Sequence, residues 1–225
     1  MLTSIKTGVL AAILVSTAIF AHAQKKITEG TVTMGISYAL TPEQEPMAAM
    51  LPTETKVKFN GNMSRFELQQ GPATITVISD NTALNSLVLI DVPVAQMQIA
   101  VKGTKEDYEK EKANDPKFSD FKATGEKQTI LTYSAEKYTY KDDKGATYEL
   151  WATNDIELPA GLMGQEFKDV KGTPIKFTRF NRGVKSTATI KAFTEEKAGP
   201  FTLDVPKGYE LKTMEEVMQM QGGGQ

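Results

Sequence analysis

Short runs in which apolar and polar residues alternate, separated by turn-forming residues, dominate this sequence. In residues 31–38 every second residue is apolar, namely Val32, Met34, Ile36 and Tyr38. This period of two is typical of a β-strand with one buried face. Turn residues recur about every 8–12 residues, and Asn60-Gly61 is a strong hairpin signal. The pattern predicts a mainly β fold, an antiparallel meander in which sequential strands pair as an open half-barrel or a similar sheet.

Two segments depart from the strand pattern. Residues 102–115 are nearly all charged and contain one aromatic residue, Tyr108. Thr104, followed three residues later by Asp107, resembles a capping box, so we expect either a solvated helix or an exposed excursion there. A second brief helix is expected over residues 213–220.

Residues 1–23 have the features of a removable signal peptide. A lysine precedes an apolar run over residues 9–21, and Ala21-His22-Ala23 is a typical signal peptidase site. The run is shorter than the roughly 20 residues that a membrane-spanning helix needs. We expect cleavage at Ala23–Gln24, a periplasmic or extracellular location with no transmembrane anchor in the mature chain, and a single β domain over residues 24–225.

The residue types that are missing exclude several chemistries. The chain has no cysteine, and its one histidine, His22, lies in the expected leader. The mature chain therefore cannot use Ser-His-Asp or Cys-His catalysis, a zinc site of Cys and His ligands, a disulfide, or haem on an axial histidine. The formal net charge is −2, without a dense basic run, so we expect no nucleic-acid partner. We also expect no cofactor and no metal; Asp142-Asp143 lacks the spacing of a calcium loop.

Apolar side chains in two loop segments could cover a sheet. Met47, Met50 and Leu51 lie between prolines that confine any helix to a short, lid-like element, and Leu162 lies in an apolar loop. Methionine adapts to irregular apolar ligands. The sequence thus predicts a non-enzymatic binder or carrier of an apolar ligand such as a lipid, although the same residues also suit a closed core. The expected ligand-binding residues are Met47, Met50, Leu51, Val57, Phe59, Phe66, Val77, Tyr148, Trp151 and Leu162.

One stretch of about thirty residues resembles a known family. It comprises Thr124–Ile130, Tyr133, Glu136–Tyr138, the turn at Asp142–Gly145, Tyr148–Trp151 and Thr153. These motifs are similar to those of uncharacterised secreted bacterial domains of the GLPGLI type, and more remotely the whole pattern resembles the LolA-like half-barrel lipoprotein carriers. Thr132 stands where the family has glycine, and Ala135 where it has cysteine. The family implies no established reaction, and the remote resemblance implies lipid binding in a half-barrel with short lid helices.

Two other functions stay open at this point. An envelope protein-interaction module without a ligand pocket would use exposed strand edges to bind a protein partner by β-addition. A carboxylate-based hydrolase would place two acids near the substrate, and Asp155 and Glu157 near Trp151 are the candidates. We do not expect the protein to be an enzyme, because acidic side chains at the end of a strand are usually solvated.

Overall fold

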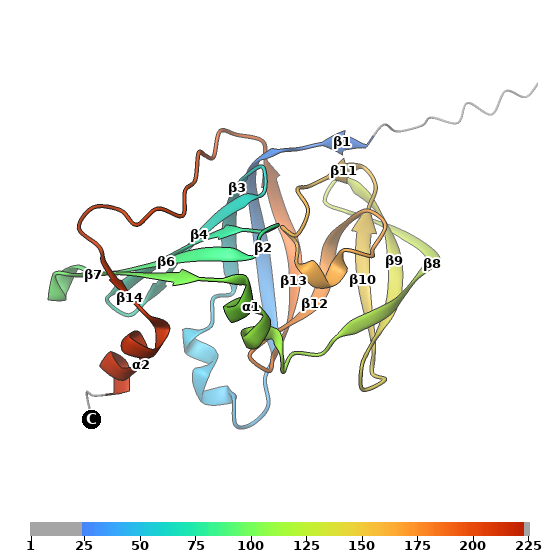
Figure 1. The fold of residues 1–225 in the computed structure, drawn as a ribbon. Helices are drawn as coiled ribbons and strands as arrows, with labels where there is room; N and C mark the ends of the chain where they lie inside the picture. The colour runs from blue at the N-terminus through green and yellow to red at the C-terminus, as the bar shows by residue number, and fades with distance from the viewer. Residues whose placement is uncertain (1–23, 223–225) are drawn as a thin grey trace, which may run out of the picture.

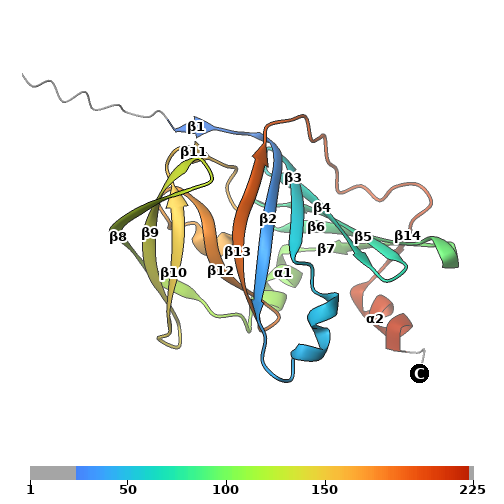
Figure 2. The ribbon, with the colours of Figure 1, turned by 180° about the vertical axis from the view of Figure 1, so that it is seen from behind.

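The protein is described by a computed structural model over residues 24–222 (Figure 1). The expected signal peptide, residues 1–23, lies outside the described residues. Twelve strands form one sheet whose outer strands are β8 (Phe118–Ile130) and β14 (Glu210–Lys212) (Figures 1 and 2). Because these two strands do not pair with each other, the sheet is not closed into a barrel. The expected mainly β, largely antiparallel open half-barrel with short helices is confirmed.

The first half of the sheet is a simple antiparallel meander. Its strands are β2 (Glu29–Ala39), β3 (Glu54–Asn60), β4 (Met63–Gln70), β5 (Ala73–Asp80), β6 (Asn85–Val92) and β7 (Met97–Gly103). The expected hairpin between β3 and β4 turns at Gly61, whose φ of 56° suits glycine best. Tight turns of this kind make sequential strands neighbours in the sheet.

The second half is a return path that brings the end of the chain back to its beginning. It contains β8, β9 (Tyr133–Asp142), β10 (Thr147–Thr153), β12 (Thr173–Asn181) and β13 (Val184–Thr194). β13 pairs with β2, where Ala188 lies opposite Ile36. β14 then adds to β7 in parallel, and β1 (Lys25–Lys26) pairs in parallel with β11 (Ile156–Glu157). The two meanders therefore share one continuous sheet.

Helices are short and lie outside the sheet. The charged segment forms α1 (Lys105–Lys112), with the expected capping box between Thr104 and Asp107, and the C-terminal segment forms α2 (Met214–Gly222). The other helical segments are short 3₁₀ helices of one or two turns, η1 (Glu45–Met50), η2 (Pro93–Ala95) and η3 (Gln165–Phe167). Among residues 24–222, no helix combines the length and apolar character required to cross a membrane.

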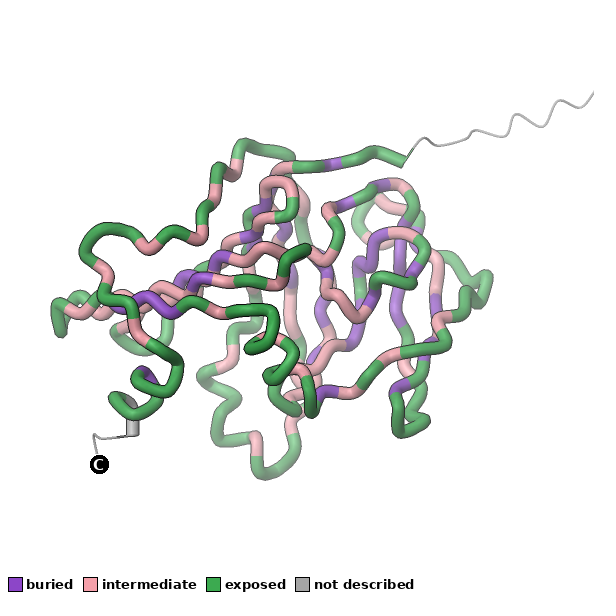
Figure 3. Tube along the Cα trace, viewed as in Figure 1, coloured by how far each residue is buried: buried purple, intermediate pink, exposed green. Residues whose placement is uncertain are grey.

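The inner face of the second half is filled by a dense aromatic core. Phe167 of η3 lies with its ring centroid 4.9 Å from that of Phe177 and 6.2 Å from that of Tyr140, and Phe118 packs 4.9 Å from Tyr140. Figure 3 shows the buried residues gathered along these strands. The loop that carries η3 therefore covers the inner face of this half of the sheet.

The first half of the sheet is covered differently on its two faces. On the outer face, Ile78, Leu87 and Ala100 are buried under the extended segment that precedes β14, through Phe201, Leu203, Val205 and Tyr209. On the inner face, α2 covers Ile99 and Val101 with the buried Val217. The rest of that inner face is left for the cavity described next.

Candidate ligand-binding cavity

A cavity of about 1030 Å³ opens between the inner face of β3–β7, α1, α2 and the loop before η3. Its floor is a row of five apolar residues that lie directly opposite one another on adjacent strands: Val57, Phe66, Val77, Val88 and Val101. The side chains reach the same face because all five strands keep one register. Phe66, Val77 and Val88 are all half-buried, so the floor offers apolar surface that the protein itself does not cover.

A second row, two residues along each strand, is made of small residues. Ser64, Ser79, Ser86 and Gly103 lie opposite one another and all line the cavity. The hydroxyl of Ser64 donates a hydrogen bond of 3.2 Å to Oδ1 of Asn81. Because these side chains are small, they leave room above the sheet. The cavity surface is apolar along the first row and polar along the second.

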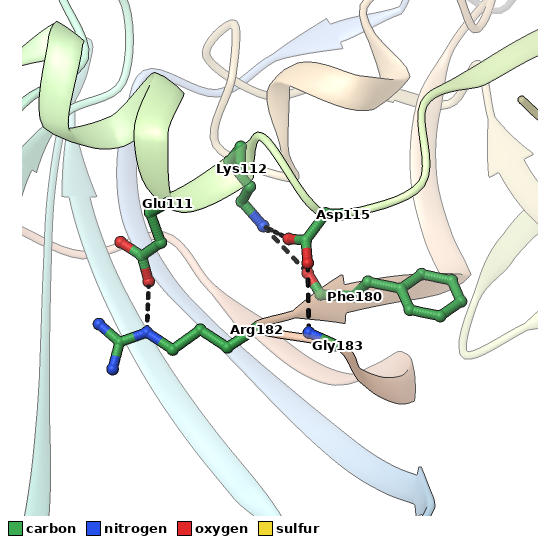
Figure 4. A network of polar contacts seen from close by, with 6 residues as sticks. All are labelled: Glu111, Lys112, Asp115, Phe180, Arg182 and Gly183. Atoms are coloured by element: carbon green, nitrogen blue, oxygen red, sulfur yellow. Dashed lines mark hydrogen bonds and ion pairs between the residues drawn. The ribbon is translucent and has the colours of Figure 1, made fainter.

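Helix α1 forms one wall and is tied to the β12–β13 hairpin by three polar contacts, supported by an ion pair within the α1 segment (Figure 4). Lys112 Nζ donates hydrogen bonds of 2.9 Å to Oδ2 of Asp115 and to the carbonyl oxygen of Phe180. Asp115 Oδ1 accepts from the backbone N–H of Gly183 at 3.3 Å, and Arg182 Nε donates to Oε1 of Glu111 at 3.1 Å. These contacts hold a helix without a buried residue of its own in place beside the cavity.

The loop before η3 forms a second wall. Gln165 Nε2 donates a hydrogen bond to the carbonyl oxygen of Asn81, in the turn after β5. Gly161 approaches the same turn closely: a Cβ at this position would lie 2.6 Å from that oxygen. This contact joins the η3 loop to the first half of the sheet at one end of the cavity.

Helix α2 closes the far side. Its first turn is capped by Thr213, whose hydroxyl accepts from the backbone N–H of Glu216 at 3.2 Å, while Glu216 accepts from the N–H of Thr213 at 2.7 Å. Leu211 and Met214 line the cavity and are 58% and 41% exposed. Since Val217 is the buried residue that attaches this helix to β7, α2 is held by a small apolar contact.

Among the many polar side chains that line the cavity, Tyr108, Glu166 and Arg179 form a group of one neutral, one acidic and one basic residue whose charges act on one another. Tyr108 is the aromatic residue of the charged helix α1. Burial and the negative charge of Glu166 raise the pKa of its phenol, and the positive charge of Arg179 lowers it. Glu166 and Arg179 therefore both lie within electrostatic reach of the Tyr108 hydroxyl.

The expected ligand-binding residues fall into separate places. Four of them, Val57, Phe66, Val77 and Leu162, line the cavity. Phe59 is fully buried in the core. Tyr148 and Trp151 border a second, smaller hollow of about 420 Å³ instead. Met47, Met50 and Leu51 belong to η1 and the residue after it and do not line the cavity; η1 connects β2 to β3, and Met50 is 66% exposed.

Sequence reasoning missed several lining residues. Val88 and Val101 alternate regularly within β6 and β7, so strand periodicity alone would have identified them once the strands were registered. Arg179 follows the buried Ile175 and Phe177 at a spacing of two, and the same periodicity places it on the inner face. No signal in the sequence brings Tyr108 next to Arg179, because they are 71 residues apart.

The candidate residues for hydrolysis and for calcium are held by the protein's own groups. Asp155 Oδ2 accepts from the backbone N–H of Ser134 at 2.6 Å, and Glu157 lies 3.7 Å from Lys26. Trp151 is only 8% exposed. Asp142 accepts from two backbone N–H groups and from the Tyr148 hydroxyl, and these hydrogen bonds lower its pKa against the opposing effect of burial. Within residues 24–222 no cluster of three or more Asp, Glu, His or Cys side chains is arranged to hold a metal ion.

Comparison with known proteins identifies a family and solved structures to which this chain is similar. A family model described as a domain of unknown function (DUF4412) matches residues 29–174. No curated protein matches the sequence. The crystal structure of an uncharacterized conserved protein from Thermus thermophilus is similar over 83% of this chain and 90% of that chain, with a TM-score of 0.43 and 12% sequence identity.

Proposed function

The chain belongs to the family described as a domain of unknown function (DUF4412), and from this premise we propose that it is an exported, non-enzymatic carrier of an apolar ligand such as a lipid. The observation that carries the proposal is the floor of the cavity. Phe66, Val77 and Val88 lie side by side under a space of about 1030 Å³. Pockets for small molecules are typically of this size and mostly apolar.

The driving force would be the removal of apolar surface from water. Each Å² of apolar surface that a ligand covers contributes about 25 cal/mol, less the cost of ordering the ligand and the walls. The walls suit such a role because α2 is attached to the sheet by a small apolar contact through Val217, whereas the sheet beneath it is continuous. Entry and release of a ligand then require movement of a helix rather than of the sheet.

The first experiment is extraction of the protein purified from its native envelope fraction with organic solvent, followed by mass spectrometry. The proposal predicts reproducible recovery of a lipid or another apolar compound. Uptake of the neutral fluorescent probe N-phenyl-1-naphthylamine by the delipidated protein measures the same site in vitro.

A variant with a filled cavity tests the location of that site. Val88→Trp places a large ring on the floor, and we expect it to abolish both the extracted compound and the probe fluorescence. The matched control is Lys56→Trp, at an exposed position of β3 in the same sheet, which should bind as the wild type does. If neither a co-purified compound nor probe uptake is found, the carrier function is excluded and an envelope protein-interaction module becomes the better hypothesis.

A further inference from the structure

We propose that the cavity recognises an amphiphile with an anionic head group, a carboxylate or a phosphate, which Arg179 and Tyr108 bind while its apolar chain lies on the valine-rich floor. This inference rests on the proposed function and specifies its ligand class. The observation behind it is that a guanidinium and a phenol hydroxyl border an apolar floor without hydrogen-bond or ion-pair partners among residues 24–222.

Arg179 is placed in the cavity by the strand that carries it. It occupies the inner-face position that follows Ile175 and Phe177 on β12, which are almost completely buried. The side chain is half-buried and lines the cavity. A charge that is partly removed from water gains from pairing with an anionic group, so the cavity offers the Arg179 guanidinium to an anionic ligand.

Two other basic residues that line the cavity have such partners. Arg182 donates to Glu111 at 3.1 Å, and Lys112 pairs with Asp115 at 2.9 Å. The hydrogen bonds and ion pairs formed within the described part of the chain include neither the guanidinium of Arg179 nor the hydroxyl of Tyr108. Both groups are therefore available as donors to a ligand.

The chemistry of these donors selects the ligand. Guanidinium binds carboxylate and phosphate groups through two parallel hydrogen bonds, and a phenol hydroxyl adds a third donor. Burial and, after it, the negative charge of Glu166 on the cavity wall raise the pKa of the Tyr108 phenol, so the phenol stays protonated and able to donate.

The test compares ligands with the same chain and different head groups. Decanoate, decyl phosphate and decanol compete with N-phenyl-1-naphthylamine, which is neutral, at about pH 8, where carboxylates are ionised. We expect both anions to bind about tenfold more tightly than decanol, the increment of a charge-assisted hydrogen bond. The difference between decanoate and decyl phosphate identifies whether the natural ligand has a carboxylate or a phosphate head.

Three variants locate the effect. Arg179→Gln should reduce the affinity for both anions about tenfold and leave decanol and the probe unchanged; Arg179→Lys, which keeps the charge but not the paired hydrogen bonds, should lie between. Tyr108→Phe should weaken the anions by a smaller factor. Arg65→Gln is the matched control, because it removes the same charge from an arginine on the other face of β4, which does not line the cavity and pairs with Glu67, and it should bind all three ligands as the wild type does.

The outcomes separate the two proposals. If the probe and decanol bind but the anions bind no more tightly, or if Arg179→Gln changes nothing, the head-group assignment is wrong and the carrier function stands. If Arg65→Gln loses as much anion affinity as Arg179→Gln, general electrostatic attraction replaces specific recognition and the assignment is again wrong. If the folded wild-type protein binds neither the probe nor any of the three ligands, both proposals are excluded.

Discussion

The ammonium group of Lys112 donates a hydrogen bond of 2.9 Å to the carbonyl oxygen of Phe180, 68 residues further along the chain. Lys112 ends helix α1, which follows the first meander, and Phe180 lies near the end of β12 in the second (Figure 4). The contact is partly shielded, since the side chains of Lys112 and its partner Asp115 are 28% and 8% exposed. It therefore ties the wall of the cavity to the opposite half of the sheet.

Replacing Lys112 by methionine should loosen this wall. The variant leaves Asp115 without its ion pair, and we expect the free energy of unfolding in urea to fall by about 1–3 kcal/mol. Amide hydrogen exchange of α1 should accelerate more than that of the sheet. Lys110→Met is the control, because its pair with Glu106 is exposed and should contribute less than about 0.5 kcal/mol; equal losses in the two variants would contradict the role given to Lys112.

Replacing Gly161 by alanine should destabilise the protein for two reasons: the residue has a positive φ, and it lies close to the turn at Asn81. Its φ is 76°, and a Cβ would lie 2.6 Å from the carbonyl oxygen of Asn81. Gly145 has a similar φ of 83° with nothing within 4 Å of a Cβ. Gly145→Ala should cost about 1 kcal/mol, and Gly161→Ala about 2–4 kcal/mol, measured by urea unfolding. Similar costs would show that the contact with the turn is unimportant.

Helix α2 should detach from the sheet when Val217, its buried contact residue, is replaced by a charged residue. Val217 is 6% exposed and packs on Ile99 and Val101, so Val217→Asp would bury an unpaired carboxylate. We expect fast amide exchange across α2, with β2–β6 still protected. Met218→Asp, at a neighbouring position that is 56% exposed, should leave the exchange of α2 unchanged; rapid exchange in both variants would mean that α2 is mobile in the wild type.

Glu29 should make the stability depend on pH. The backbone N–H groups of Ala198 and Gly199, which donate to its carboxylate at 2.8 and 3.3 Å, lower its pKa below the ordinary value of 4.5. A lowered pKa in the folded state means that the carboxylate stabilises the fold above pH 4.5, and that this contribution is lost as the pH falls through the folded-state pKa.

Glu29→Gln tests this dependence by thermal unfolding across a pH series. The melting temperature of the variant should lie below that of the wild type near neutral pH. The difference should shrink as the medium becomes more acidic than pH 4.5, the ordinary pKa of the carboxyl group. A difference that is constant over the whole series would show that the charge of Glu29 does not matter.

Much of the architecture could be predicted because it depends on neighbouring residues. The strand over residues 31–38, the hairpin at Gly61 and the capped helix at Thr104 all follow from patterns of a few residues, and each is confirmed. The expected uncharacterised domain family is confirmed as the DUF4412 family, while the narrower resemblance to the GLPGLI type stays a prediction. Export and lipid binding also stay predictions.

The cavity itself was predicted only in part. Val57, Phe66 and Val77 were expected because they alternate in adjacent hairpins, whereas Tyr148 faces the aromatic core of the second half, where the rings of Phe118 and Phe180 lie 5.5 and 6.0 Å from its own. The lid expected from Met47 and Met50 is instead an exposed turn between β2 and β3. The walls of the cavity are formed instead by α1, α2 and the loop before η3, which are distant from one another in the chain.

Local chemistry was enough to set the strands, turns and caps, since each depends on the conformational preference of residues close together in the chain. The pairing of β13 with β2, the insertion of Phe167 into the second half and the placement of Tyr108 and Arg179 around one cavity were settled only by packing. Those contacts join residues far apart in the chain, and their energies depend on the register of the whole sheet. A hollow beside a filled core is thus a property of the assembled sheet, because every strand by itself has the same alternating pattern.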